Sequence, residues 1–249
     1  KQKYLEGMFQ TTGPFPHQNS LVMYMIVYGS VFLAYLLNVK DAKIYVWILA
    51  FGAASVDIIS TLSRGGMAEF TLSIFIIFML SYINKFSIKK LLISFVFLIM
   101  ASGILYKASD SIIERIRTAP KESLNVRIKL AIAAQNMANE KIFGIGLNNF
   151  ALKINPPYTY SKHIQRKDDD EKGGLVETIY LLIAAETGWL NLGVFVYLLL
   201  FFYFKNIQNY FLLKKGKYKK YRYIPIALFA TLSSIYLQSS MEWVLKQTN

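Results

Sequence analysis

Long apolar segments constrain the fold of this 249-residue chain more than any other feature. A helix needs about 20 apolar residues, within a range of about 17–25, to cross the hydrocarbon core of a bilayer. The sequence holds six segments that are long enough or nearly so, at 20–39, 44–62, 67–83, 91–106, 175–204 and 223–245. We therefore predict an all-α polytopic membrane protein with about six transmembrane helices and a large, partly helical extracytoplasmic loop at 107–174.

The distribution of positive charge predicts how these helices are oriented. Although 54% of the residues are hydrophobic, the formal net charge is +13. The connections at 40–43, 84–90 and 205–222 carry two, three and seven Lys and Arg residues, and they fall on one side if the helices alternate. The positive-inside rule makes that side cytoplasmic. The N-terminal segment, the turn at 63–66, the 107–174 loop and the C-terminal end then lie outside.

The basic segment 205–222 is interpreted as an orientation signal that also attracts anionic membrane lipid. Its tyrosines are typical of a membrane interface. No nucleic-acid-binding fold accompanies it, so we expect no nucleic-acid partner.

The start of the sequence bears on domain organisation. The chain begins at Lys1, and its first residues lack the apolar core of a signal peptide. We expect a single membrane domain over 1–249 that is part of a longer protein. The chain contains no cysteine, which excludes disulfides and thiolate chemistry.

An arginine stands between two apolar segments in the stretch "STLSRGGMAEF". Asp57 precedes Arg64 by seven residues, which places both on one face of a continuous helix. Ionisable groups in such positions pair with each other or line a polar cavity. Two interpretations follow: a structural Asp57–Arg64 pair, or an arginine that meets an anionic ligand. Gly65 and Gly66 allow a tight turn and would leave amide donors beside the guanidinium.

The 107–174 loop holds further arginines. A helix is predicted from an N-cap at Ser123 to about Asn139, with Arg127 on a largely apolar stripe. Arg127 is either a solvated, snorkelling side chain or a ligand-binding one. Arg115 and Arg117 lie just before this helix and form either a wet basic surface or a binding cluster.

Two glutamates flank the start of the fifth apolar segment. Glu177 and Glu186 are nine residues apart, which puts them on opposite faces of an ideal helix, so they are not a simple paired-carboxylate site. Gly188 is expected to end a short helix before the true span begins at Trp189. His17 and His163 lack metal-ligand spacing, and we expect no metal and no cofactor.

Three stretches carry a resemblance to a known family: "GPFPHQNSLVMYM" (13–25), "STLSRGGMAEFTLSIFIIFML" (60–80), and "RIKLAIAAQNMANEKIFGIGLNNF" (127–150) leading to "VETIYLLIAAETGWLNLGVF" (176–195). In order and spacing they resemble the O-antigen polymerase and O-antigen ligase superfamily of bacterial envelope enzymes. The chain looks like the C-terminal half of such a protein.

The resemblance implies a function and a location. Members transfer a glycan from an undecaprenyl-diphosphate carrier to an acceptor sugar or lipid, and ligases do so without a metal. The implied location is the bacterial cytoplasmic membrane, with the active site on the extracytoplasmic face. The implied partners are the undecaprenyl-diphosphate-linked glycan, an acceptor glycan, membrane lipid, and a chain-length regulator or a flippase.

The resemblance also assigns residues to motifs. Arg64 matches the arginine of the "SRG" element, and Arg127 the arginine that precedes "P-x-x-G-x-G", here "KIFGIG" with Lys141 in place of proline. Asn19 matches the asparagine that closes "G-x-F-x-x-x-N". Ligases often carry a histidine, a candidate base, at the position of Glu177. This difference favours a polymerase over a ligase.

The chemistry of the transfer suggests a role for each residue. A diphosphate leaving group develops negative charge, which Arg64 and Arg127 would stabilise, and Glu177 would accept the proton of the acceptor hydroxyl. The remaining candidates for substrate binding are Asn19, Arg115, Arg117, Tyr180 and Glu186. Tyr180 either stacks on a sugar or packs, and Glu186 is either structural or acceptor-binding.

Other functions remain as alternatives. A ligase would move a finished polymer to a lipid or protein acceptor. A polysaccharide transporter or flippase would place polar residues near mid-membrane and show inverted repeats. A non-enzymatic scaffold would not need several arginines in one cavity.

Overall fold

A computed structural model provides the structure of the chain. It describes residues 2–5, 8–15, 17–39, 43–84, 86–95, 99, 121–155, 157–158, 160, 174–213 and 217–241. The chain forms two compact units: the first comprises 1–105 and 202–238, and the second 106–201 and 239–248. The predicted site residues are divided between them, with Asn19 and Arg64 in the first and Arg127 and Glu177 in the second.

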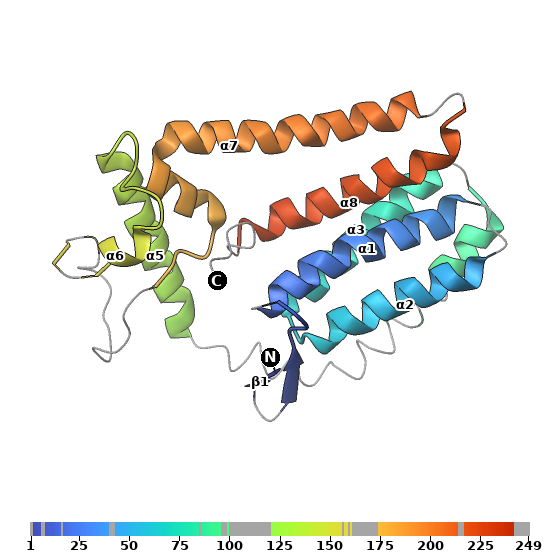
Figure 1. Ribbon diagram of the computed structural model, residues 1–249, viewed down its shortest axis with the longest axis horizontal. Helices are drawn as coiled ribbons and strands as arrows, with labels where there is room; N and C mark the ends of the chain where they lie inside the picture. The colour runs from blue at the N-terminus through green and yellow to red at the C-terminus, as the bar shows by residue number, and fades with distance from the viewer. Residues whose placement is uncertain are drawn as a thin grey trace. The chain divides into compact units, whose positions relative to one another are not determined.

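The first unit is a bundle of long helices. It contains α1 (Gln18–Asn38), α2 (Ile44–Ser60), α3 (Arg64–Asn84), the 3-10 helix η2 (Lys219–Arg222) and α8 (Tyr223–Gln238). Helix α1 packs against α2, α3 and α8, and α3 packs against α8 (Figure 1). An antiparallel hairpin of β1 (Gln2–Leu5) and β2 (Met8–Thr11) precedes α1, with Gln2 opposite Thr11. The hairpin was not predicted, because its strands are too short to show a clear period.

Aliphatic side chains fill the core of this bundle. Ile26, Leu33, Ile58, Ile77 and Ile226 are all completely buried. Small polar residues also meet inside the bundle, as between Ser30 Oγ and Ser73 Oγ at 2.6 Å. Such contacts are common between membrane helices, where small side chains let backbones approach and a hydroxyl must find a partner.

Most described residues of the predicted apolar segments are helical; the exceptions lie near the segment ends, at 39, 61–62, 175–178 and 239–241. Helices α1, α3 and α7 (Ile179–Leu212) are the ones in the described part of the chain that are long and apolar enough to cross a membrane. Helix α2 is shorter, with 17 residues, and α8 has 16. Most of the segment 91–106 lies outside the described residues. The helical membrane class is confirmed, and the count of six spans stays a prediction.

The starts of α1 and α3 meet at one end of the bundle and their ends meet at the other, as the alternating helices predict. At one end, Ser63 Oγ donates to Asn19 Oδ1 at 2.8 Å and joins the start of α1 to the start of α3. At the other end, Lys90 Nζ donates to the carbonyl of Ser81 at 2.6 Å and to Asn38 Oδ1 at 3.3 Å. Which end faces the cytoplasm stays a prediction.

The second unit is built on α5 (Lys121–Glu140), α6 (Phe150–Lys153) and the first part of α7. Its core holds Leu130, Ala134, Met137, Phe150, Ile154, Ile179 and Leu182. The predicted helix over 123–139 is confirmed, but Ser123 does not cap it, because α5 begins two residues earlier, at Lys121.

Helix α7 is broken at Gly188. The backbone of this glycine is non-helical, with φ 88° and ψ 164°, and it divides α7 into a short arm, 179–187, and a long arm, 189–212. Figure 1 shows the change of direction between the two arms. The predicted break at Gly188 is thus confirmed.

Candidate active site

The "SRG" element forms the corner between α2 and α3. Helix α2 ends at Ser60, and Leu62 takes the left-handed conformation with φ 54°. Ser63 then caps α3: its Oγ accepts from the Gly66 amide at 3.1 Å, and its carbonyl accepts from the Met67 amide at 2.9 Å. The expected continuous helical face from Asp57 to Arg64 is therefore wrong, because the chain turns between them.

Gly66 serves helix packing rather than ligand access. A Cβ at this position would lie 2.5 Å from Val22 Cγ1 on α1, so only glycine allows this approach of the two helices. Its amide donates to Ser63 Oγ. The expectation that Gly66 presents an accessible donor beside the guanidinium is wrong.

Asn19 is tied to this corner. Its Oδ1 accepts from Ser63 Oγ, and its backbone amide donates to His17 Nδ1 at 3.2 Å. Two of the sequence elements, "G-x-F-x-x-x-N" and "SRG", thus meet through one hydrogen bond. Arg64 is the first residue of α3, and its side chain lies outside the described part of the structure.

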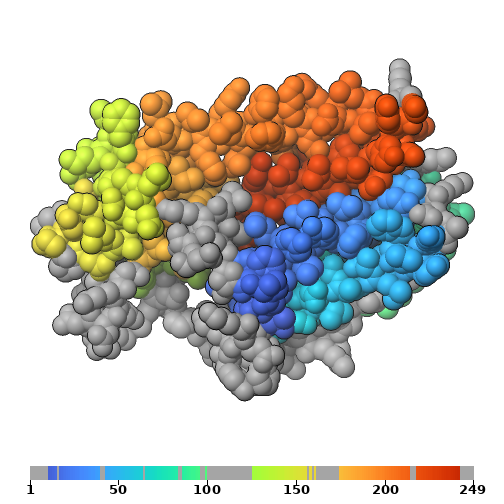
Figure 2. All heavy atoms as spheres, in the orientation of Figure 1, coloured from blue at the N-terminus to red at the C-terminus, as the bar shows by residue number. Residues whose placement is uncertain are grey.

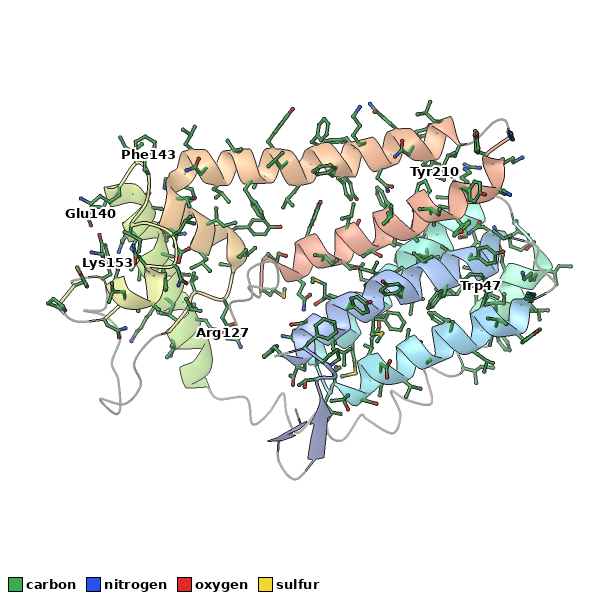
Figure 3. All side chains as sticks on the ribbon, in the orientation of Figure 1. Trp47, Arg127, Glu140, Phe143, Lys153 and Tyr210 are labelled. Carbon is green, nitrogen blue, oxygen red and sulfur yellow. The ribbon has the colours of Figure 1, made fainter. Side chains whose placement is uncertain are left out.

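Arg127 and Glu177 form an ion pair in the second unit. Arg127 Nε lies 2.8 Å from Glu177 Oε1, and the two side chains are 55% and 31% exposed. Arg127 projects from the first half of α5 (Figure 3), whereas Glu177 lies just before the first residue of α7. Arg127 is therefore paired with a carboxylate rather than merely solvated.

The loop at 141–149 docks on the "AETG" element. The amides of Ile145 and Gly146 donate to the carbonyls of Ala185 and Glu186, both at 2.9 Å. Gly144 and Gly146 have φ of 68° and 98°, values that glycine adopts without strain. The two family elements thus form one backbone-paired structure.

Glu186 is buried within this structure. The residue is 2% exposed, and its Oε1 accepts a hydrogen bond from the Phe150 amide at 3.4 Å. This contact favours the structural interpretation of Glu186 over acceptor binding. The helical-face reasoning for Glu177 and Glu186 fails, because Glu177 precedes α7.

The remaining predicted residues receive less support. Tyr180 packs near Phe195, with ring centroids 6.3 Å apart, across the break in α7. Arg115 and Arg117 lie outside the described residues. Across the described residues, no group of three or more His, Cys, Asp or Glu side chains could hold a metal ion.

A small polar cluster lies at the C-terminal end of α5. Glu140 Oε1 lies 3.9 Å from Lys141 Nζ, and Glu140 Oε2 accepts from the hydroxyl of Tyr160. Burial, followed by the hydrogen bond and the negative charge of Glu140, raises the pKa of Tyr160 to about 12. Tyr160 is therefore a neutral donor over the physiological range.

Glu69 is a residue that the sequence reasoning missed. It lies in α3, is 6% exposed, and its carbonyl accepts from Ser234 Oγ at 3.2 Å. An acidic residue inside an apolar segment is the signal that could have marked it, because such residues carry functional or pairing roles in spans.

These observations define a class: a helical membrane protein in which one unit carries a partly exposed arginine–glutamate pair and two docked, glycine-containing elements. A family model described as O-antigen ligase matches residues 45–198, which is more than half of the chain. The chain belongs to the O-antigen ligase family. The matched region includes Arg64, Arg127 and Glu177, whereas Asn19 precedes it. Neither the curated proteins nor the solved structures contain a significant match to this chain.

Proposed function

We propose that this protein polymerises lipid-linked oligosaccharide repeat units at the extracytoplasmic face of the bacterial cytoplasmic membrane. The donor would be a glycan on an undecaprenyl-diphosphate carrier, and the acceptor would be the hydroxyl of another glycan. The observation that carries this proposal is the contact between Arg127 and Glu177, because it puts a fixed cation beside a carboxylate. Membership of the O-antigen ligase family supports lipid-linked glycans as the substrate class.

Arg127 is suited to the diphosphate. The ion pair uses Nε, so the two terminal nitrogens of this 55%-exposed side chain can still reach phosphate oxygens. A guanidinium stays charged at any working pH and can bind phosphate through two parallel hydrogen bonds. Negative charge grows on the diphosphate as it leaves, and a preorganised cation stabilises that charge.

Glu177 is the proposed general base. The acceptor oxygen would form a bond to the anomeric carbon of the donor sugar while the bond from that carbon to the diphosphate oxygen breaks. The proton of the acceptor hydroxyl would pass to the Glu177 carboxylate. A diphosphate that binds Arg127 would compete with Glu177 for the guanidinium, so substrate binding would release the base where the acceptor arrives.

Arg64 is the proposed second cation for the same diphosphate. It stands at the first position of α3, where the positive end of the helix dipole favours a nearby anion. The hydrogen bond between Ser63 and Asn19 would make both of them positioning residues for Arg64. Arg115, Arg117 and Tyr180 remain proposed substrate contacts, with Tyr180 either stacking on a sugar or packing.

The runner-up is a ligase that moves a finished polymer to a lipid or protein acceptor. The description of the matching family favours it. Glu177, at a position where ligases often carry histidine, favours the polymerase.

The experiment complements a host that lacks its own polymerase with the protein and reads glycan length on a gel. A restored polymer ladder supports a polymerase. If removal of the protein from its native host instead leaves long polymer on the carrier, the protein is a ligase. A single repeat unit in the complemented host, together with an unchanged glycan in the native host without the protein, contradicts both functions.

A further inference from the structure

Three large apolar side chains stand on the loop that follows α5. Ile142, Phe143 and Leu147 are 78%, 73% and 74% exposed. Single exposed apolar residues are ordinary, but a cluster within six positions marks a surface that meets another apolar phase. We call these three residues the apolar knuckle; Figure 3 labels Phe143 within it.

The exposure of the knuckle is built into the fold. The backbone bonds from Ile145 and Gly146 to the "AETG" element hold the middle of the loop, between Phe143 and Leu147. Trp189 Nε1 also donates to Asn139 Oδ1 at 2.8 Å, which fixes the end of α5 to the start of the long arm of α7. The apolar side chains therefore point outward from a well-supported loop.

The knuckle adjoins the long arm of α7. A Cβ at Gly188 would lie 1.9 Å from the carbonyl oxygen of Ile142, so the loop touches the residue that opens this arm. The arm itself carries exposed apolar side chains, including Leu190 at 66% and Val194 at 53%. Figure 2 shows the side chains of α7, in orange, on the surface of the molecule. A long apolar helix with such a surface faces lipid.

The level of the knuckle in the membrane follows from the length of this arm. A span takes at least about 17 helical residues, and counting back that far from Phe204, the last residue before the basic segment 205–222, ends at Gly188. Gly188 and Trp189 then lie at the edge of the hydrocarbon core, next to the interfacial layer where tryptophan is enriched. The knuckle touches this level. Lys141, beside it, has a side chain that is 60% exposed and suits lipid phosphates.

We propose that the apolar knuckle inserts into the interfacial layer of the bilayer leaflet at the Trp189 end of α7, where it contacts phospholipid. Lys141 binds the phosphates above it. This insertion anchors α5, and with it the Arg127–Glu177 pair, to the membrane that supplies a lipid-linked substrate. The inference rests on the membrane placement of α7 and not on the proposed polymerisation.

The chain has no cysteine, so a single introduced thiol can carry a fluorescent label. The full chain with Phe143→Cys is labelled with an environment-sensitive fluorophore and reconstituted into vesicles of phosphatidylcholine and phosphatidylglycerol. Gln135→Cys, at an exposed polar position of α5, is the matched control. We expect the label at 143 to be blue-shifted, quenched by bromine-labelled lipid and protected from iodide, and the label at 135 to show the reverse.

Two results would overturn the inference. Equal quenching of both labels by iodide would put the knuckle in water. Protection of the label at 143 from both quenchers would show that protein covers it. Leu147→Cys gives an independent second position if the Phe143 variant fails to fold.

Discussion

Glu177 is held by a contact that contributes little to stability. Both members of its ion pair with Arg127 are substantially exposed, at 55% and 31%. Exposed pairs are worth about 0–1 kcal/mol, because water screens the charges and the side chains lose freedom. A large functional effect therefore cannot come from the loss of this ion pair's contribution to stability alone.

At this scale, Glu177→Gln is predicted to reduce polymer synthesis by about 10²–10⁴-fold, as for the loss of a general base. Its free energy of unfolding should change by less than about 1 kcal/mol. Glycan gels and thermal unfolding measure the two effects. Glu140→Gln, which alters another exposed glutamate of the same unit, should leave the ladder intact. Near-normal synthesis with Glu177→Gln would remove Glu177 from the mechanism.

Asn19 offers a second test at the residue scale. Asn19→Leu removes the acceptor of the Ser63 hydroxyl and should lower both protein stability, by about 1 kcal/mol, and polymer synthesis. Asn19→Asp keeps an oxygen acceptor at the same place and should retain most of both. If Asn19→Leu loses synthesis at unchanged stability, Asn19 contacts substrate instead of positioning the corner.

At the scale of elements, glycine determines how the 141–149 loop meets α7. Gly188 has φ 88°, and a Cβ there would collide with the carbonyl of Ile142. Gly193 lies in the same helix, and a Cβ there would meet nothing within 4 Å. The two positions form a matched pair for substitution.

Gly188→Ala is predicted to destabilise the second unit by several kcal/mol, because the substitution is strained and the loop must move. Gly193→Ala should be neutral or stabilising by up to about 1 kcal/mol. Hydrogen exchange at the Ile145 and Gly146 amides, together with thermal unfolding, measures the effect. Full protection of these two amides in Gly188→Ala would show that the docking does not depend on this glycine.

Local patterns predicted the helices but not how they meet. Apolar segments and a glycine before Trp189 were sufficient to place α1, α3, α7 and the break in α7. The corner at Leu62 could not be predicted. The two glycines at 65–66 suggested that the turn lies there, but they belong to the first turn of α3. The pairing of 145–146 with 185–186 depends on backbone groups distant in the sequence, which no residue type reveals.

The chemical type of a residue was sufficient to select candidates for the site, but it did not predict which residues contact one another. Arg127 and Glu177 have separate predicted roles, as diphosphate-binding cation and as base, and their contact joins residues 50 positions apart, which no local pattern reveals. The sequence left Glu186 either structural or acceptor-binding, and its burial and its contact with the Phe150 amide favour the structural role.

At the scale of the whole molecule, the proposal requires Arg64 and Arg127 to act on one diphosphate. Groups that serve the same ligand show non-additive effects, whereas independent groups add. Arg64→Lys and Arg127→Lys are each predicted to shorten or abolish the ladder, and the double variant should lose less activity than the sum of the two losses in activation free energy. Initial rates of polymer synthesis measure this. Strict additivity would contradict a shared diphosphate.

The most direct test of the central claim exchanges the charges of the ion pair. In the double variant Arg127→Glu with Glu177→Arg, the attraction between the two positions is kept but each chemical role is moved to the wrong place. We predict wild-type expression and thermal stability with no polymer ladder, because the cation and the base no longer face their own reacting groups. Recovery of a normal ladder by the exchanged pair would show that Arg127 and Glu177 serve only to hold α5 to the start of α7.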